Sequence, residues 1–443
     1  MEEIKKCHIN EAIKKYAKIS KARFHMPGHK GSIKGLKKFA KLDTTELEVI
    51  QNQEVLRLAE KDIANIYGSQ YCRIISGGAT QAILAMVCAV KHLGDKLIIS
   101  RFSHKSIFNA CKLFNIEPVI LSSIIIGEKS YHPTLEEIDN AIKNNPNSIG
   151  VFLNGTDYYG NTLNAKQVRQ IVEKYNKLLI LDNAHGAHLK FTGDTYAGDY
   201  ADMWADSAHK TLSSFNQGAM VFCNNSKLIN ELENSLDILL TTSPSYPILG
   251  SVEYGVKNYA YFGKKALNRA IKLTSRFIQK IKKLGIECSI SGDKLRFCIE
   301  TSQSQLDAKQ VEQILAKKGI FPEMNDGYRL LFMVSSKNTK RDFYRLYKGL
   351  KCVAKSKNIG KNQKAIIVSN KKINYLEATK SEYILVDIKN SVGKISASSV
   401  GLFPPCFPLV VAGEEITEEI AQILLESTNV FGLEQGKIKI IKE

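Results

Sequence analysis

The feature that most constrains the fold is an alternation of two kinds of segment between about residues 59 and 223. Short apolar runs typical of strands occupy residues 96–100, 118–122, 149–154, 178–182, 203–206 and 219–223. Helix-like stretches lie between several of them, at residues 82–92, 106–114, 134–144 and 165–175. Strands that alternate with helices predict an α/β fold, in which a mostly parallel sheet carries helices on both faces. In such sheets, ligands bind beyond the carboxyl ends of the strands.

The pattern of apolar and polar residues changes after this region. Residues 251–283 form a long amphipathic stretch that predicts a connecting helix or a helix pair. Residues 288–301 and 328–335 then have the pattern of strands, and residues 307–318 and 339–351 that of helices. We therefore expect three parts: an N-terminal segment over residues 1–50, a large domain over 51–265, and a smaller α+β domain over 266–443.

Composition narrows the class of protein. The 443 residues include 62 Lys and Arg against 44 Asp and Glu, a net charge of +18. The lysines are spread along the whole chain, without zinc-finger spacing or an RNP-like aromatic run, so we interpret them as solvated surface residues and expect no nucleic-acid partner. No apolar run reaches the roughly 18 residues that span a bilayer, and the N-terminus lacks an apolar segment. Nine scattered cysteines without a Cys-x-x-Cys pair are typical of reduced thiols, so we expect a cytoplasmic protein away from membranes.

Histidines are scarce but clustered. Six of the nine lie in four short groups, at positions 25 and 29, 104, 185 and 188, and 209. His25 and His29 have the spacing of two metal ligands on a helix, but Pro27 and Gly28 between them make a regular helix unlikely. His185 and His188 lack the glutamate of a zinc-protease helix. We therefore expect no metal.

Two segments contain residues suited to a covalent cofactor. In LLILDNAHGAH (178–188), Asp182 ends a buried strand, where a carboxylate either caps the next helix or holds a cation. In DSAHKT (206–211), Lys210 lies among small residues near a strand end. Schiff-base chemistry needs such a lysine with a lowered pKa, although most lysines are simply surface residues.

Two further segments contain residues that could contact a cofactor. IISGGATQA (74–82) has an apolar run, two glycines and Thr80 before a helix, which is typical either of a phosphate-binding helix start or of a plain turn. It matches neither the Gly-x-Gly-x-x-Gly nor the Walker pattern. In RFSHKS (101–106), His104 follows a strand and could stack on a flat ring or cap the next helix.

Taken together, these segments resemble the Orn/Lys/Arg decarboxylase family of fold-type I pyridoxal-phosphate (PLP) enzymes, in its shorter form without an N-terminal wing domain. The resemblance runs from about residue 20 to 265 and returns at 392–417. It rests on FHMPGHKGS (24–32), TTEL (44–47), SGGATQAILAM (76–86), RFSHKS, LDNAHGAHL (181–189), DSAHKT, QGA (217–219), TTSPSY (241–246) and FPPCFPLVVAGEEIT (403–417). The most specific feature is DNAHGAH followed about twenty residues later by SAHKT.

The resemblance implies a role for each matching residue. Lys210 forms the Schiff base with PLP, Asp182 pairs with the pyridine nitrogen, His104 stacks on one face of the ring and Ala184 packs under the other. The phosphate is held by Gly78, Ala79, Thr80, Ser207 and His209.

Other matching residues are implied at the edges of this site. His185 lies near the ring oxygen or the substrate carboxylate, and His25 and His29 near the entrance as substrate contacts. Ser243 and Ser245 reach the phosphate of the neighbouring subunit, because the family builds its site at a dimer interface.

The chain departs from the family where it would face the substrate. The segment after Leu47 is shorter than usual and lacks a Pro-Gly, and residues 404–408 read PPCFP instead of PPGIP. In GTDYYG (155–160), Asp157 stands where a threonine often contacts the cofactor, so we predict a substrate-site role for it. Ala79-Thr80 replaces the usual Ser-Thr.

The function implied is decarboxylation of lysine, arginine or ornithine to the amine and CO₂, by a homodimer or larger homo-oligomer, with polyamine synthesis as one possible use of the product. Two alternatives within the fold stay open: an aminotransferase or lyase, with Arg296 or Arg329 as the carboxylate clamp, and a catalytically weak PLP-binding paralogue. A third alternative is a basic nucleic-acid-binding protein, which salt-sensitive binding to DNA would support.

Overall fold

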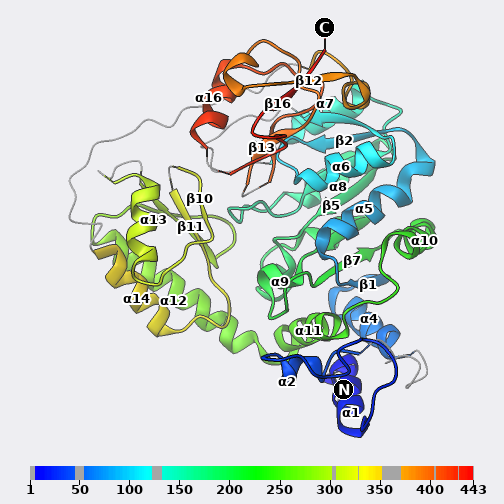
Figure 1. Ribbon diagram of the computed structural model, residues 1–443, viewed down its shortest axis with the longest axis vertical. Coiled ribbons are helices and arrows are strands. Elements are labelled where there is room, and N and C mark those ends of the chain that lie inside the picture. The colour runs from blue at the N-terminus through cyan, green and yellow to red at the C-terminus, as the bar shows by residue number, and fades with distance from the viewer. Residues whose placement is uncertain are drawn as a thin grey trace. The chain divides into compact units, whose positions relative to one another are not determined.

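The computed structural model describes residues 5–44, 54–121, 132–301, 306–327, 329–351, 371–403, 406–427 and 429–442. The chain forms two compact units (Figure 1). The first comprises Met1–His92, Asn164–Arg169 and Leu178–Lys265, and the second Leu93–Leu163, Gln170–Lys177 and Ala266–Glu443. The three-part domain division expected from the sequence stays a prediction.

Seven strands form one large sheet, in the order β1-β7-β6-β5-β4-β2-β3. Parallel pairs join β5 to β6 and β2 to both β3 and β4, which confirms the predicted α/β class with a mostly parallel sheet. Strand β7 (Ala219–Cys223) runs antiparallel to both of its neighbours. The connection from β6 to β7, residues 207–218, contains one helix, the four-residue α9 (Ala208–Thr211), which is shorter than the helices that usually form parallel crossovers.

The first unit holds the helices and strands nearest the expected cofactor segments. In chain order they are α1 (His8–Ile19), α2 (Lys37–Ala40), α4 (Glu54–Tyr67), β1 (Tyr71–Ile75), α5 (Gly78–Val90), β5 (Leu178–Asp182), β6 (Met203–Asp206), α9, β7, α10 (Ile229–Leu239) and α11 (Tyr246–Lys257). The residues of β5, β6 and β7 are almost all buried, as expected of strands covered on both faces. Strand β1 was not among the predicted strands, because its arginine and cysteine interrupt the apolar pattern.

A buried charge cluster fixes the N-terminal helix within the first unit. The backbone N–H groups of His8 and Ile9, at the start of α1, donate to the fully buried carboxylate of Glu253 at 2.7 and 2.9 Å. Lys257, one turn further along α11, lies 3.1 Å from Glu253 and 2.6 Å from Asp62. A carboxylate at a helix N-terminus is favourable, and the neighbouring ammonium group compensates its burial. The N-terminal segment is therefore held by α11.

The second unit holds the other strands of the large sheet and the strands of the three smaller sheets. Its elements are β2 (Lys96–Ser100), α6 (Lys105–Leu113), β3 (Glu117–Leu121), α7 (Leu135–Asn144), β4 (Gly150–Asn154), β8 (Cys288–Ile290), β9 (Arg296–Glu300), α13 (Ala308–Ala316), β10 (Met324–Asn325), β11 (Arg329–Met333), α14 (Lys340–Lys351), α15 (Tyr375–Lys380), β12 (Tyr383–Val386), β13 (Val400–Leu402), β14 (Pro408–Val410), α16 (Glu418–Glu426), β15 (Val430–Phe431) and β16 (Ile438–Ile441). Helix α8 (Ala165–Lys174) precedes β5. The predicted stretch 251–283 is divided between α11, a π-helical turn (Asn258–Phe262) and α12 (Lys264–Lys282).

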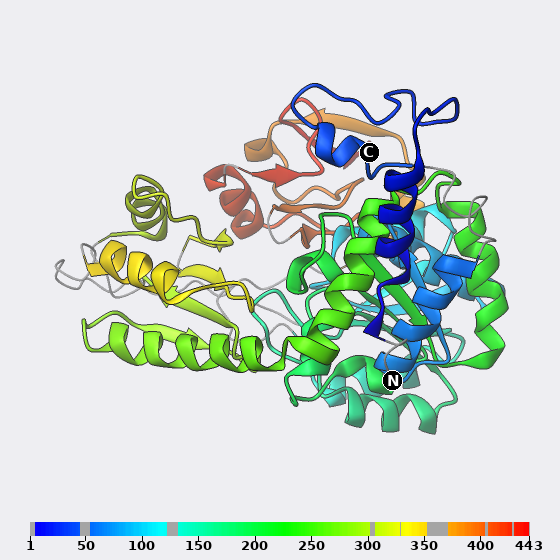
Figure 2. The same ribbon diagram turned by 90° about the horizontal axis from the view of Figure 1, so that it is seen from below.

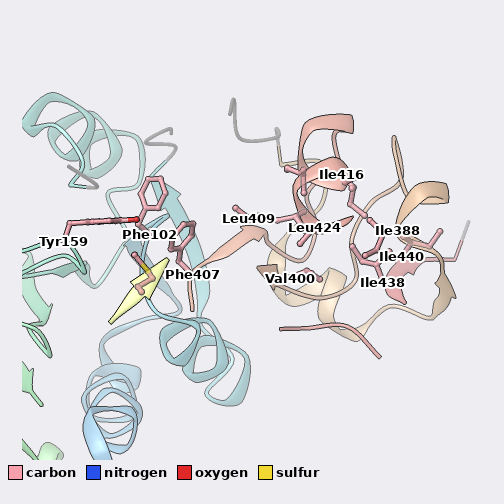
Figure 3. Close-up of a cluster of buried hydrophobic side chains, with 14 of the residues drawn as sticks. Phe102, Tyr159, Ile388, Val400, Phe407, Leu409, Ile416, Leu424, Ile438 and Ile440 are labelled. Carbon is pink, nitrogen blue, oxygen red and sulfur yellow. The ribbon is translucent and has the colours of Figure 1, made fainter. Parts of the chain in front are cut away.

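An antiparallel sheet in the order β10-β11-β9-β8, which lies beside α12 and α14 in Figure 2, contributes side chains to two cores of the second unit. Phe297 and Phe332 point to a core formed with α12, α13 and α14. Cys298 and Leu331 point the other way, to a core that includes Val400, Ile438 and other residues of the C-terminal strands (Figure 3). The alternation follows from the two-residue period of a strand. Within the described residues, no helix is both long enough and apolar enough to cross a bilayer.

Candidate active site

The first unit brings two of the chemistry-bearing segments together at adjacent strand ends. Strand β5 ends at Asp182, which is paired in parallel register with Ala205 on β6. Strand β6 ends one residue later, and Ser207 and α9, with Lys210, follow directly. The carboxyl ends of these two strands therefore place Asp182 and the Ser207–Lys210 segment at the same edge of the sheet.

Asp182 is a buried carboxylate with a defined environment. Its Oδ1 accepts a hydrogen bond from the backbone N–H of Ala184 at 3.0 Å. Burial raises the pKa of Asp182, and the positive charge of Lys210 and the Ala184 hydrogen bond act against that rise. A second cation beside Asp182 would favour the ionised form further, which suits a protonated pyridine nitrogen.

Lys210 projects from α9 and is exposed, with its Nζ 3.1 Å from Nε2 of His185. The neighbouring His209 uses Nδ1–H to donate to the carbonyl of Gly218 at 3.0 Å. Burial lowers the pKa of His209, so its neutral ring presents Nε2 as an acceptor. A phosphate dianion at Nε2 would therefore have to bind the protonated form of this ring, which its negative charge favours.

The start of α5 has the features of a phosphate-binding helix N-terminus. Gly78 adopts φ +76°, and its N–H donates to the carbonyl of Gln217 at 2.8 Å. No side chain caps the helix at Gly77, where an added Cβ would lie 1.7 Å from Oε1 of Gln81. Ala79 is buried and Thr80 is exposed at the helix start. These residues fit PLP: the uncapped helix start suits its phosphate, the Lys210 amine its aldehyde and the Asp182 carboxylate its pyridine nitrogen.

Sequence reasoning missed a buried network behind these residues. Asp206 is fully buried and accepts hydrogen bonds from Nδ2 of Asn183 at 2.7 Å and from the hydroxyl of Tyr196. Nε1–H of Trp204 donates to the same hydroxyl at 2.7 Å. The network ties the residue after Asp182 to the residue before Ser207. Its only signal in the sequence was a carboxylate that ends a buried strand directly before SAHK.

This network predicts a pH dependence of stability. Burial raises the pKa of Asp206 from 3.8 to about 7. Between about pH 4 and 7 the unfolded chain has therefore released this proton and the native state has not, so wild-type stability falls as pH rises through that window, by up to about 1.4 kcal/mol per pH unit. Asp206→Asn has no such proton, so urea unfolding at several pH values should show the variant gaining stability relative to the wild type as pH rises from 4.5 to 7. A constant difference would contradict the burial of an ionisable Asp206.

His104 lies in the second unit as the N-cap of α6. Its Nδ1 accepts from the backbone N–H of Ser106 at 3.2 Å, and the Ser106 hydroxyl lies 2.8 Å from the same nitrogen. In the neutral ring, Nε2 therefore carries the hydrogen. The capping role considered for His104 is present, and it fixes the orientation of the ring. Stacking on a cofactor stays a prediction.

The two histidines of FHMPGHKGS are engaged inside the N-terminal segment. The ring of His25 donates from Nδ1 to the carbonyl of Met26 and accepts at Nε2 from the hydroxyl of Tyr16. The ring of His29 accepts from the N–H of Gly31 at Nδ1 and donates from Nε2 to Asp43 at 3.1 Å. Both rings thus stabilise the loop that contains them, and their predicted substrate contacts would require these bonds to change.

The second unit gives Asp157 a structural environment. Its Oδ1 accepts from the N–H of Asn161 at 2.8 Å and its Oδ2 from the Asn161 side chain at 2.7 Å, across a turn that contains Gly160 at φ +92°. Arg296 donates to the carbonyl of Asp157 at 2.9 Å and pairs with Asp293 at 3.2 Å. Asp157 therefore organises a turn, and its substrate role stays a prediction.

Arg329, the other arginine considered as a carboxylate clamp, also has a carboxylate partner. Its Nε lies 2.7 Å from Asp326, and its guanidinium lies 3.9 Å from the ring centroid of Tyr159. Both candidate clamps are thus buried and paired with an aspartate three residues before them. An aminotransferase would have to break one of these pairs to bind a substrate carboxylate.

Ser243 is exposed, and Ser245 is the N-cap of α11 without a side-chain capping bond. Leu47 with the segment after it, and Pro404 and Pro405, lie outside the described residues. In the second unit, two of the matched segments meet: Arg101 of RFSHKS forms a buried bidentate pair with Glu414 of VVAGEEIT. Within the described residues, no group of three or more His, Cys, Asp or Glu side chains is arranged to hold a metal ion.

Comparison with solved structures identifies the fold. The lysine decarboxylase of Francisella novicida superposes with a TM-score of 0.79 at 19% identity, over 98% of this chain and 81% of that one. An SPT structure solved with PLP superposes with a TM-score of 0.58 at 14% identity, over 78% of this chain and 83% of that one. The fold is therefore that of the fold-type I PLP enzymes, as the sequence predicted.

The sequence identifies the family within that class. The model of the Orn/Lys/Arg decarboxylase major domain matches residues 8–295, and the chain belongs to this family. A curated relative, the arginine decarboxylase of Bacillus subtilis, is 25% identical over 476 residues, with 97% of both chains covered. The family resemblance drawn from the motifs is thus confirmed.

Proposed function

We propose that the protein is a PLP-dependent decarboxylase that converts lysine, arginine or ornithine to the corresponding amine and CO₂. The observation that carries the proposal is the buried Asp182 carboxylate at the end of β5, beside the Ser207–Lys210 segment that follows β6, with the Lys210 amine 3.1 Å from Nε2 of His185. The names of the relatives, an arginine and a lysine decarboxylase, support a basic amino acid as the substrate.

In this proposal, each residue has a separate task. Lys210 supplies the amine that holds the cofactor covalently and that the substrate amine displaces. Its hydrogen bond to His185 lets a proton pass between Nζ and Nε2, so that Nζ can be the neutral nucleophile. Asp182 keeps a negative charge beside the pyridine nitrogen. When bound, PLP supplies an acceptor for the electron pair that remains after the carboxylate leaves.

The surrounding residues bind the phosphate of the cofactor and position Asp182 and Lys210. The start of α5 with Gly78, Ala79 and Thr80, and the Ser207–His209 segment, would hold the phosphate. The Asp206 network stiffens the strand ends that present Asp182 and Lys210. The placement of His104, Ala184, Ser243 and Ser245 toward the cofactor, a homodimer with shared sites and a cytoplasmic location are parts of the same proposal that rest on the family resemblance.

A substrate screen tests this proposal. Protein supplied with PLP is given carboxyl-labelled lysine, arginine or ornithine separately, and released CO₂ is measured beside keto-acid formation in the presence of an acceptor keto acid. CO₂ from one or more of the three, without keto acid, is expected. Keto acid instead of CO₂ would establish an aminotransferase, and PLP absorbance without either product would establish a weak paralogue.

A further inference from the structure

The positive charge of the protein is concentrated in one part of the second unit. Residues 266–351 contain 18 Lys and Arg against 8 Asp and Glu, whereas the other 357 residues contain 44 against 36. More than half of the net charge of +18 therefore belongs to fewer than one fifth of the residues. The lysines do occur along the whole chain, and acidic residues are about as frequent here as elsewhere, so the local excess comes from a higher density of Lys and Arg.

Two neighbouring helices carry this excess. Phe277 of α12 and Phe343 of α14 pack with ring centroids 5.2 Å apart, and Nζ of Lys280 lies 4.1 Å from the ring centroid of Tyr347. Both views show the two helices side by side (Figures 1 and 2). Their apolar residues enter the same core, so their other faces together form one exposed surface.

The cations on this surface are arranged in stripes. On α12 and the residue after it, exposed cations recur every three or four residues, at Arg269, Lys272, Arg276, Lys280 and Lys283. On α14 they recur in the same way, at Arg341, Arg345 and Lys348. Such spacing puts each set on one side of its helix. The α12 stripe is about 21 Å long at 1.5 Å per residue. We call these eight residues the basic face.

Counter-charges are missing from α12. The sequence has no acidic residue between Lys264 and Ile286, and within the described residues no carboxylate lies within ion-pair distance of the five α12-stripe cations. The acidic residue of α14, Asp342, is used to cap that helix, where it accepts from the N–H of Thr339 at 2.8 Å. Like charges one turn apart repel each other, so an extended anion laid along the face would relieve this repulsion.

We propose that the basic face binds the phosphate backbone of a nucleic acid. A linear polyanion matches two stripes of evenly spaced cations better than a small anion does, because the charge is spread along about 21 Å of α12 instead of being gathered at one point. A bilayer surface fits less well: helices that lie on membranes insert large apolar side chains, and those of α12 are buried in the core. The face also presents Tyr344, 54% exposed, on which an unpaired base can stack.

This proposal departs from the expectation of no nucleic-acid partner. That expectation rested on the even spread of lysines along the sequence, whereas the packing of α12 against α14 gathers their cations on one surface. The proposal is independent of the proposed decarboxylation, because the basic face contains none of the residues assigned to it.

The test uses the full chain supplied with PLP and fluorescently labelled 20-nucleotide probes, as duplex DNA and as single-stranded RNA. Binding is followed by anisotropy between 50 and 200 mM salt. The variant Arg269→Gln/Lys272→Gln/Arg276→Gln/Lys280→Gln should bind at least about tenfold more weakly, with a salt slope smaller by about 3. A matched variant with the same change in net charge, Lys61→Gln/Lys112→Gln/Lys166→Gln/Lys227→Gln, should bind within twofold of the wild type.

Further arms separate the possible outcomes. Tyr344→Ala should weaken binding to the single strand several-fold and leave duplex binding unchanged. Unchanged CO₂ release and thermal unfolding of the variants would show that the fold is retained. Equal losses in both fourfold variants, tighter binding to anionic phosphatidylglycerol vesicles than to either probe, or no salt-dependent binding of the wild type would each overturn the proposal.

Discussion

Replacement of Lys210 by alanine is expected to lower CO₂ release by at least about 10³-fold while the protein stays folded. The variant keeps the strand ends, the Asp182 carboxylate and the helix start of α5, but it lacks the amine that lies 3.1 Å from His185. The rate of CO₂ release and the visible absorbance of the PLP-supplied protein should both change. Because Lys210 is exposed on a short helix, its removal should leave the unfolding transition of the protein without PLP almost unaffected.

Two controls make this prediction specific. Lys210→Arg retains the positive charge but not a nucleophilic amine, so it should be as inactive as the alanine variant if the amine is what matters. Lys227→Ala, at another exposed lysine of the same unit, should behave as the wild type. Activity above about a tenth of the wild-type rate in Lys210→Ala would show that the assignment of Lys210 is wrong.

Replacement of Asp182 by asparagine is expected to lower activity without lowering stability. Asparagine keeps the shape and the acceptor for the Ala184 N–H but removes the charge, so CO₂ release should fall by roughly 10²-fold or more. Because burial raises the pKa of Asp182, its ionised form destabilises the native state at neutral pH. The variant without PLP should therefore unfold at equal or higher urea concentration than the wild type at pH 7.

The stability difference between Asp182→Asn and the wild type should also change with pH. As pH rises above the usual carboxyl range, the unfolded wild type ionises at Asp182 more readily than the native state, so the stability advantage of Asp182→Asn should grow. Asp199→Asn, at an aspartate that pairs with Lys190 on the surface, should change neither property appreciably. A variant that loses stability together with activity would indicate a structural role for Asp182.

The local pattern of the sequence predicted the large sheet well. The runs at 96–100, 178–182, 203–206 and 219–223 coincide with β2, β5, β6 and β7, because an apolar strand buried on both faces leaves an uninterrupted signal. Helix ends were displaced by a few residues. The start of α5 lies four residues before its predicted position, because Gly78 at φ +76° begins the helix without a capping side chain.

Side-chain environments could not be predicted in the same way. Pro27 and Gly28 argue against a helical metal pair at His25 and His29, but the sequence does not distinguish substrate contact from loop stabilisation. Only the folded loop shows the ring nitrogens engaged with Tyr16, Met26, Gly31 and Asp43. Likewise, nothing near Asp157 in the sequence indicates that its carboxylate closes a turn onto Asn161.

The sequence by itself determined the α/β class, the family and the segments that precede and follow the strand ends, because these depend on apolar periodicity and on residues close to one another in the chain. Only the tertiary structure decided the antiparallel course of β7, the pairing of Arg101 with Glu414 across 313 residues, the Asp206 network and the gathering of cations on α12 and α14. These features arise when distant segments pack together, and the free energy of burial and pairing that selects them belongs to the whole fold and not to any local stretch.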